Sequence, residues 1–290
     1  MKVDKISRTA QYMAFFRALE TKRFNNGNLF SDTYAIHFLD SGLKLAVNLS
    51  NWPFFKSALK KIMHKKIPGA YSSGVARTKY IDDLLYSTIK DGVQQVLILG
   101  AGFDTRSSRL EFLQSIPVIE FDHPNTSSYK TDVYIKRIGT LPQHVICCPI
   151  DFNKESLEEI AERNNLDFTK PTTVIWEGVT NYLTAEAIDK TFSFISKFVK
   201  GSYVIFTYVH KHVIENPCSF FGAAKLIKDL EKLQERWTFG FLPQELANYL
   251  SNFGLTLVKD LGATEYRQKY LPERTEKGYE FYRVAIAKLK

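Results

Sequence analysis

Val96-Leu97-Ile98-Leu99-Gly100-Ala101-Gly102-Phe103-Asp104-Thr105-Arg106 is the stretch that decides the fold class of this chain. Its first four residues are apolar, which is typical of a strand buried on both faces of a parallel sheet. Gly100 and Gly102 then allow the backbone to turn tightly and to approach a ligand at the carboxyl end of that strand. The stretch therefore predicts an α/β fold with a nucleotide-like cofactor beside this strand.

Two cofactor classes compete for this loop. A dinucleotide-binding fingerprint requires a third small residue, where this chain has Thr105. The carboxylate of Asp104 would also lie where the negative pyrophosphate of NAD belongs. A cofactor with a ribose and no phosphates fits better, and S-adenosylmethionine has in addition a cationic sulfonium that nearby acids stabilise. An NAD-dependent oxidoreductase remains the alternative.

Acidic residues close the next expected strands. Asp122 ends the apolar segment 116–122, about 20 residues beyond the glycines, which is the spacing of a ribose-binding carboxylate. Glu120 shares the strand face but lies one pleat deeper, and it is the alternative for that role. Asp151 and Glu177 close two further strands. Because the ligand crevice of an open α/β sheet lies at the carboxyl ends of its strands, these acids are expected to converge.

Six segments together resemble the leucine carboxyl methyltransferase-like family of S-adenosylmethionine-dependent O-methyltransferases, and the resemblance runs through most of the chain. The segments are Ala76–Asp83, Gly100–Arg106, Glu120–Pro124, Ile150–Phe152, Glu177–Leu183 and Gly240–Leu246.

The resemblance implies a site for S-adenosylmethionine. It would consist of Arg77, Gly100, Gly102, Asp122, Asp151, Phe152 and Glu177. Arg77 would hold the methionyl carboxylate through a charge-assisted contact, and Asp122 would accept hydrogen bonds from the ribose hydroxyls. Asp151 and Phe152 would frame the adenine. Glu177 would lie near the amino group and the sulfonium.

The pattern of elements predicts one domain over residues 1–290. Residues 1–92 are expected to form a helical cap, residues 93–290 a Rossmann-like core, and residues from about 212 to 240 a lid over the acceptor site. Strands are expected near 96–100, 117–121, 145–149, 173–177, 203–208, 255–259 and 281–288. The last strand follows the sixth too closely for a crossover helix, which predicts an antiparallel hairpin. The resemblance implies the seven-stranded, mostly parallel sheet of class I methyltransferases.

Composition suggests a cytoplasmic protein without a membrane partner. The 44% hydrophobic content of the 290 residues is ordinary for a globular protein. The N-terminus lacks the apolar core of a signal peptide, and no apolar run approaches the roughly 18 residues of a membrane span. Three cysteines suit a reducing compartment. His210 and His212 have no acid or cysteine at supporting spacing, so no metal is expected.

Part of the net charge of +8 lies in lysines that recur at helical spacing, Lys56, Lys60, Lys61, Lys65 and Lys66. They are interpreted as the solvated face of an amphipathic helix whose apolar side holds Phe54, Phe55, Leu59, Ile62 and Met63. A basic patch also attracts anionic substrates or RNA. Because no RNA-binding motif accompanies it, a small-molecule acceptor is expected rather than a nucleic acid.

The chemistry depends on the acceptor. A carboxylate is ionised at neutral pH and needs no general base, so the enzyme only has to hold it in line with the methyl group and exclude water. A hydroxyl acceptor requires a base, for which His210 is the candidate, while Tyr182, Tyr208 and Arg267 are candidates to orient the acceptor.

The sequence therefore predicts an S-adenosylmethionine-dependent O-methyltransferase that methylates a carboxylate of a small molecule by direct in-line transfer. Other acceptors stay open, namely a protein C-terminal carboxylate, a hydroxyl or a modified tRNA base. Two other classes also stay open: an NAD-dependent oxidoreductase, and a non-catalytic protein that binds nucleotides or RNA.

Overall fold

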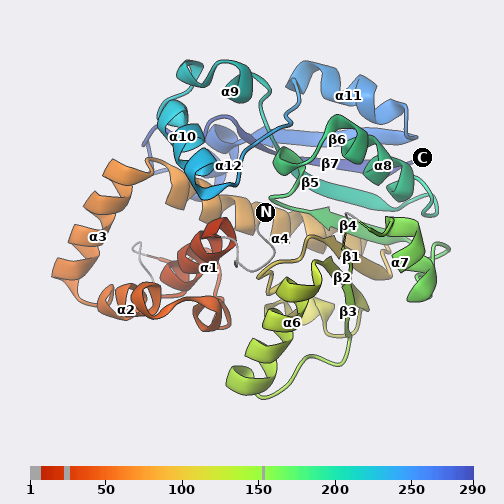
Figure 1. Cartoon of the computed structure of the whole chain (residues 1–290), viewed down its shortest axis with the longest axis horizontal. Coiled ribbons are helices and arrows are strands. Elements are labelled where there is room, and N and C mark those ends of the chain that lie inside the picture. The colour runs from red at the N-terminus through yellow and green to blue at the C-terminus, as the bar shows by residue number, and fades with distance from the viewer. Residues whose placement is uncertain (1–7, 23–26, 152–153) are drawn as a thin grey trace.

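A seven-stranded sheet with the order β3-β2-β1-β4-β5-β7-β6 forms the centre of the computed structural model, which describes residues 8–22, 27–151 and 154–290 (Figure 1). The strands are β1 (Gln95–Leu99), β2 (Val118–Asp122), β3 (Val145–Pro149), β4 (Thr172–Trp176), β5 (Tyr203–Val209), β6 (Leu255–Gly262) and β7 (Tyr282–Leu289). Neighbours among β1 to β5 pair in parallel, whereas β7 is antiparallel to both β5 and β6.

Helices precede β1 and separate most of the later strands. The four longest that precede β1 are α1 (Arg8–Thr21), α2 (Ser41–Leu49), α3 (Pro53–Lys66) and α4 (Ala70–Lys90). The others are α5 (Arg106–Arg109), α6 (Pro124–Val133), α7 (Leu157–Arg163), α8 (Ala185–Ile195), α9 (His212–Glu215), α10 (Ala223–Leu233), α11 (Pro243–Ser251) and α12 (Ala263–Tyr270).

The sheet is buried on both faces, as β1 illustrates. Val96 and Ile98 pack into a core with residues of α1, α4 and α12, whereas Leu97 and Leu99 pack into a second core with residues of α7, α8 and α11. Successive side chains of a strand point to opposite faces, so a continuous apolar run belongs in a strand covered on both sides. The predicted doubly covered sheet is confirmed.

The seven predicted strands agree closely with the observed ones, and the antiparallel last strand is confirmed. β6 and β7 pair as neighbours from Leu255 opposite Leu289 to Gly262 opposite Arg283. The connection between them is longer than a tight hairpin, because the short helix α12 lies within it. This helix packs against α4, and its Ala263 and Tyr266 join the core on that face of the sheet.

The segment between β5 and α11 carries α9 and α10 and builds a small core of its own. Val213 and Leu230 pack there with Trp237 and with Phe281 and Tyr282 next to the start of β7. Figure 1 shows α10 between α9 and the N-terminal helices α1 and α3. The predicted boundaries of a cap, a core and a lid stay a prediction.

The expected packing of the basic helix, α3, is wrong at three of its five apolar positions. Phe54, Phe55 and Ile62 are exposed, and Met63 alone is fully buried. The reason is the place of the helix: α3 lies at the margin of the molecule, away from the sheet (Figure 1). Helical periodicity identifies an apolar face but not whether another element covers it.

Candidate functional site

The site begins at the glycine loop after β1. Gly100 has φ of +67° and Gly102 has φ of +49°, a left-handed conformation that side chains rarely adopt. A Cβ on Gly100 would lie 2.5 Å from Cγ2 of Val179, in the loop after β4. Both glycines line a cavity of about 1670 Å³ at the carboxyl ends of β1, β2 and β4. The loop therefore needs glycine both for its backbone angles and for this close approach.

Asp122 lies at the end of β2 and lines the same cavity. Its carboxylate accepts hydrogen bonds from the backbone N–H of Gly102 and, at 2.6 Å, from that of His123. Burial raises the pKa of Asp122 above its usual value, against the effect of these bonds. The alternative acid, Glu120, pairs instead with Lys130 at 2.7 Å and does not border the cavity.

Arg77 reaches the cavity from α4 and meets Glu177 from the end of β4. Its Nε donates to Oε1 of Glu177 at 2.9 Å, and its guanidinium lies 4.5 Å from the ring centre of Tyr282. Within the described residues Glu177 is the only acid at salt-bridge distance from Arg77. A buried arginine with one carboxylate partner can still engage a second carboxylate through its terminal nitrogens.

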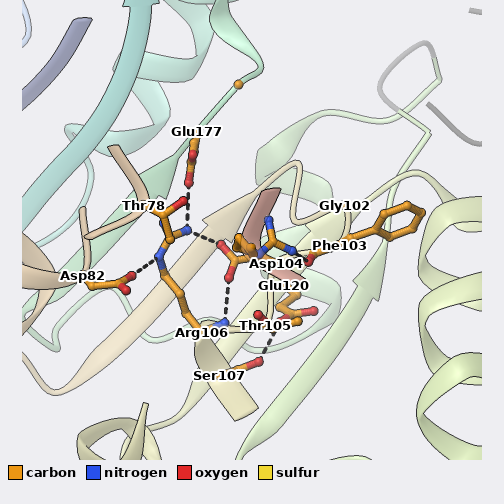
Figure 2. Close-up of polar contacts among 12 residues, drawn as sticks. Thr78, Asp82, Gly102, Phe103, Asp104, Thr105, Arg106, Ser107, Glu120 and Glu177 are labelled. Carbon is orange, nitrogen blue, oxygen red and sulfur yellow. Dashed lines mark hydrogen bonds and ion pairs between the residues drawn. The ribbon is translucent and has the colours of Figure 1, made fainter. Parts of the chain in front are cut away.

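Arg106 joins Glu177 to two other acids beneath the glycine loop, as Figure 2 shows. Its guanidinium contacts Asp82 at 2.8 Å, Asp104 at 2.5 Å and Glu177 at 2.8 Å. Burial by itself would raise the pKa of Asp104, but Arg106 and its other cationic neighbours outweigh it, so that this pKa falls to about 2. Burial would also raise the pKa of Glu177, but Arg106 and Arg77 outweigh it and lower this pKa. Both carboxylates are therefore ionised at neutral pH.

Arg106 and Asp82 have no predicted role from the sequence, although both lie in segments that carry the family resemblance. Asp82 also accepts two hydrogen bonds from Arg109, at 2.7 and 2.8 Å. One signal was present in the sequence: Arg106 and Arg109 directly follow the glycine loop. Asp104 is two residues from Arg106, but the partners Asp82 and Glu177 come from two distant segments and could not be read from the sequence.

A second ion pair, from the N-terminal segment, holds Phe103 and Thr105 of the glycine loop. Arg17 of α1 contacts Asp32 at 2.8 Å and donates to the carbonyl of Phe103 at 2.5 Å. Thr105 donates to the same Asp32 at 2.7 Å. Thr105, which disagrees with a dinucleotide fingerprint, thus anchors the glycine loop to the N-terminal segment.

The remaining predicted cofactor residues are Asp151 and Phe152. Asp151 follows β3 and forms an ion pair with Lys154 at 3.1 Å, and it does not border the cavity. Phe152 lies outside the described residues. Their role at the adenine stays a prediction.

Of the four candidates for acceptor chemistry, Tyr182 alone borders the cavity. Burial raises the pKa of its hydroxyl to about 12. Tyr208 donates to Asp260 at 2.6 Å, Nδ1 of His210 accepts from the backbone N–H of His212 at 3.2 Å, and Arg267 donates to the carbonyl of Glu276 at 2.9 Å. These three residues are not brought to the cavity, and their roles stay predictions.

Beyond the residues at the carboxyl ends of the strands, the cavity is lined by residues of α3 and α10. Apolar side chains form much of this wall: Leu43, Leu59, Ile62, Met63, Leu226, Leu230 and Leu233. Four lysines border it, Lys65, Lys66, Lys225 and Lys232, with Asp229 as an acid between the last two. The volume exceeds the roughly 300–1,000 Å³ of an ordinary ligand pocket, so a cofactor and a second molecule both fit. Among the described residues, no three His, Cys, Asp or Glu side chains are grouped so that they could hold a metal ion.

The sheet order, the antiparallel β7 between β5 and β6, and the cavity beside the glycine loop define a class I methyltransferase fold. A protein of the DUF574 family from Streptomyces avermitilis has this fold with a TM-score of 0.58 at 13% identity, over 94% of this chain and 97% of that one. Magnesium protoporphyrin IX methyltransferase from Synechocystis PCC 6803, solved with bound S-adenosylhomocysteine, has a TM-score of 0.50 at 12% identity, over 85% and 99% of the two chains.

Sequence comparison then gives the family. The model of the leucine carboxyl methyltransferase family matches residues 10–196, so the chain belongs to that family. A curated relative from Mycobacterium ulcerans, named "Putative S-adenosyl-L-methionine-dependent methyltransferase", is 29% identical over 195 residues, which are 67% of this chain. The match covers 63% of the length of that relative. These comparisons support S-adenosylmethionine over NAD as the cofactor and confirm the predicted family.

Proposed function

We propose that this protein transfers a methyl group from S-adenosylmethionine to a carboxylate of a small acid with an apolar body. The observation that carries the proposal is the extension of the cavity, which is apolar in its wall and bordered by four lysines, Lys65, Lys66, Lys225 and Lys232. Apolar walls favour an apolar acceptor, and an excess of lysine favours a negatively charged one. The activity and the acceptor are both part of the proposal.

The cofactor residues fit S-adenosylmethionine. Gly100 lets the backbone approach the methionyl part. Arg77 borders the cavity, and its only carboxylate partner among the described residues is Glu177, while its Nη2 donates to Sδ of Met13 at 3.3 Å. Asp122 is held by two backbone N–H groups and is an acceptor for ribose hydroxyls. Asp104 and Glu177 are ionised and favour a cation nearby. When bound, the cofactor supplies an electrophilic methyl group on a sulfonium.

The cavity offers little for deprotonating an alcohol. Among the described residues that line it, His123 is the only histidine, and its Nδ1 accepts a hydrogen bond from the backbone N–H of Asn125 at 3.3 Å. Tyr182 stays protonated at neutral pH, because its pKa is raised to about 12. A carboxylate needs no base, since it is already ionised. The protein then has to hold the carboxylate, orient it and exclude water.

The first experiment is a calorimetric titration of the purified protein with S-adenosylmethionine, S-adenosylhomocysteine and NAD. Binding of the first two without NAD is expected. The protein is then incubated with methyl-labelled S-adenosylmethionine and a panel of apolar carboxylic acids, each matched with the alcohol of the same carbon skeleton. Methyl esters release labelled methanol in base, whereas methyl ethers do not.

A carboxyl methyltransferase is supported if the products of the acids release labelled methanol in base and the matched alcohols take up no label. Transfer to the alcohols alone, in base-stable form, contradicts the carboxylate acceptor but keeps the methyltransferase. Binding of NAD in place of both S-adenosyl compounds contradicts the whole proposal. Arg77→Ala serves as the control for cofactor-independent label, because it removes the residue proposed to hold the methionyl carboxylate.

A further inference from the structure

Three aromatic side chains lie exposed and adjacent at the corner between α2 and α3. Phe54 is 79% exposed, Trp52 is 67% exposed and Phe55 is 45% exposed. The rings of Phe54 and Phe55 meet edge to face with their centres 5.7 Å apart. We call Trp52, Phe54 and Phe55 the tip cluster. Single exposed apolar residues are ordinary, but a contiguous exposed group of large ones marks an interaction surface.

The segment that carries the tip cluster has charges of one sign. Residues 41–69, which include α2 and α3, contain six lysines and neither aspartate nor glutamate. The lysines are Lys44, Lys56, Lys60, Lys61, Lys65 and Lys66. This segment of 29 residues therefore contributes +6, compared with a net charge of +8 for the whole chain. Such a surface attracts a partner that is strongly anionic.

The place of the segment in the fold leaves the tip cluster accessible. Figure 1 shows α2 and α3 at the margin of the molecule, on the side of α1 away from the sheet. Farther along α3, Leu59, Ile62 and Met63 border the cavity. One helix therefore connects the exposed aromatic corner to the wall of the proposed acceptor site.

We propose that the tip cluster and the lysines of α2 and α3 bind the surface of a membrane that contains anionic lipids. Aromatic rings partition into the boundary between headgroups and acyl chains, while lysines contact the anionic headgroups. Leu45 on α2 is also 58% exposed, and an aliphatic side chain gains from acyl chains but not from stacking on nucleic-acid bases. The combination favours a membrane surface over RNA.

This proposal differs from the sequence-based expectation that no membrane is a partner. That expectation rested on the lack of a spanning segment, and no helix in the described ranges is long and apolar enough to cross a bilayer. Binding at the surface requires only an amphipathic segment with basic residues. The separate expectation that Phe54 and Phe55 pack on the apolar side of the helix is contradicted by the structure, which leaves both exposed. The proposal does not depend on the methyltransferase activity.

The test is co-sedimentation of the full chain with vesicles of equal parts phosphatidylcholine and phosphatidylglycerol, and with vesicles of phosphatidylcholine alone. The protein is expected to sediment with the anionic vesicles and to be released by high salt. The double variant Trp52→Ala/Phe54→Ala is expected to bind the anionic vesicles at least about tenfold more weakly, because it lacks two aromatic rings whose transfer from water to the membrane favours binding. Ile135→Ala, at a residue 58% exposed elsewhere, is the matched control and should sediment as the wild type does.

A second pair of variants separates the charge from the apolar contact. Lys61→Glu is expected to weaken sedimentation with the anionic vesicles, whereas Lys190→Glu on α8 changes the net charge equally and should have little effect. Trp52, Phe54 and Lys61 do not border the cavity, so calorimetric affinity for S-adenosylmethionine serves as the test of intact folding.

Several results would overturn the proposal. One is equal sedimentation of the wild type and the tip-cluster variant, both with unchanged cofactor affinity. Another is binding of a single-stranded RNA oligonucleotide without binding of anionic vesicles. A third is concentration-dependent dimerisation that the tip-cluster variant abolishes, again without vesicle binding. A wild type that does not bind S-adenosylmethionine would contradict the proposed function alone, and urea denaturation would then replace calorimetry as the test of intact folding.

Discussion

At the scale of single residues, Arg77 links the cofactor proposal to a measurable contact. It is buried, borders the cavity and pairs with Glu177 at 2.9 Å. Arg77→Ala is expected to weaken binding of S-adenosylmethionine by about 1.5–3 kcal/mol, the size of a hydrogen bond to a charged group. Calorimetry measures this loss, and Arg163→Ala, at an exposed arginine on α7, is the control. Unchanged affinity of the Arg77 variant would remove this residue from the site.

Asp122 provides an independent test, because a ribose is present in both S-adenosylmethionine and S-adenosylhomocysteine. Asp122→Ala is expected to weaken both ligands equally, by about 1–3 kcal/mol, since each loses the same acceptor. Asp132→Ala changes an exposed acid on α6 and should leave both affinities unchanged. A loss limited to S-adenosylmethionine would assign Asp122 to the sulfonium side instead of the ribose.

At the scale of elements, a buried ion network attaches α4 to the segment after the glycine loop. Asp82 of α4 contacts Arg106 at 2.8 Å and Arg109 at 2.7 Å, and all three side chains are buried. Asp82→Ala would leave two buried guanidinium groups short of a partner, which is far more costly than losing a surface pair. We expect the free energy of unfolding to fall by about 3–5 kcal/mol.

The next residue on α4 supplies the matched control. Asp83 pairs with Lys79 at 2.5 Å and accepts from Tyr270 at 2.7 Å, but its side chain is 38% exposed. Asp83→Ala is expected to cost about 1 kcal/mol in urea denaturation. Similar losses for the two variants would show that the network around Arg106 adds little to the attachment of α4.

The strands could be predicted from the sequence because burial on both faces leaves an unbroken apolar run, as in Val96 to Leu99. Asp122 and Glu177 were found because an acid after such a run lies at the crevice of the sheet. The packing of Phe54 could not be predicted, because a helical pattern does not identify a covering element. The pairing of Arg106 with Asp82 and Glu177 could not be predicted either, because these acids lie far from it in the sequence.

At the scale of the whole molecule, the cavity depends on elements from both ends of the chain. Arg17 of the N-terminal helix α1 supports the glycine loop together with its partner Asp32, which follows that helix in the chain. Towards the other end of the chain, α10 contributes Leu226 and Leu230 to the cavity wall. Much of the support consists of buried carboxylates that are paired with arginines. The stability of the whole fold should therefore respond to acid.

The direction of that response follows from the pKa shifts. Pairing with arginines lowers the pKa of Asp32, Asp104 and Glu177 in the folded protein, although burial alone would raise each of them. A carboxyl group with a lowered pKa stabilises the fold above its unfolded pKa, and this contribution is lost as the pH falls through the folded value. Burial raises the pKa of Glu20 and Asp122. These two groups therefore reduce the stability of the fold above about pH 4, where they would be ionised in the unfolded chain.

A single variant isolates one member of this group from the opposing ones. The pKa of Asp104 falls from an ordinary 3.8 to about 2, which corresponds to about 2 kcal/mol of stability at neutral pH. Asp104→Asn should therefore be less stable than the wild type by about that amount at pH 7, measured by urea denaturation. The two proteins should approach equal stability as the pH falls from about 4 towards 2, because the wild-type carboxyl group then becomes protonated and neutral like the amide. A stability difference that stays constant across this range would mean that the loss comes from altered packing and not from the charge of Asp104.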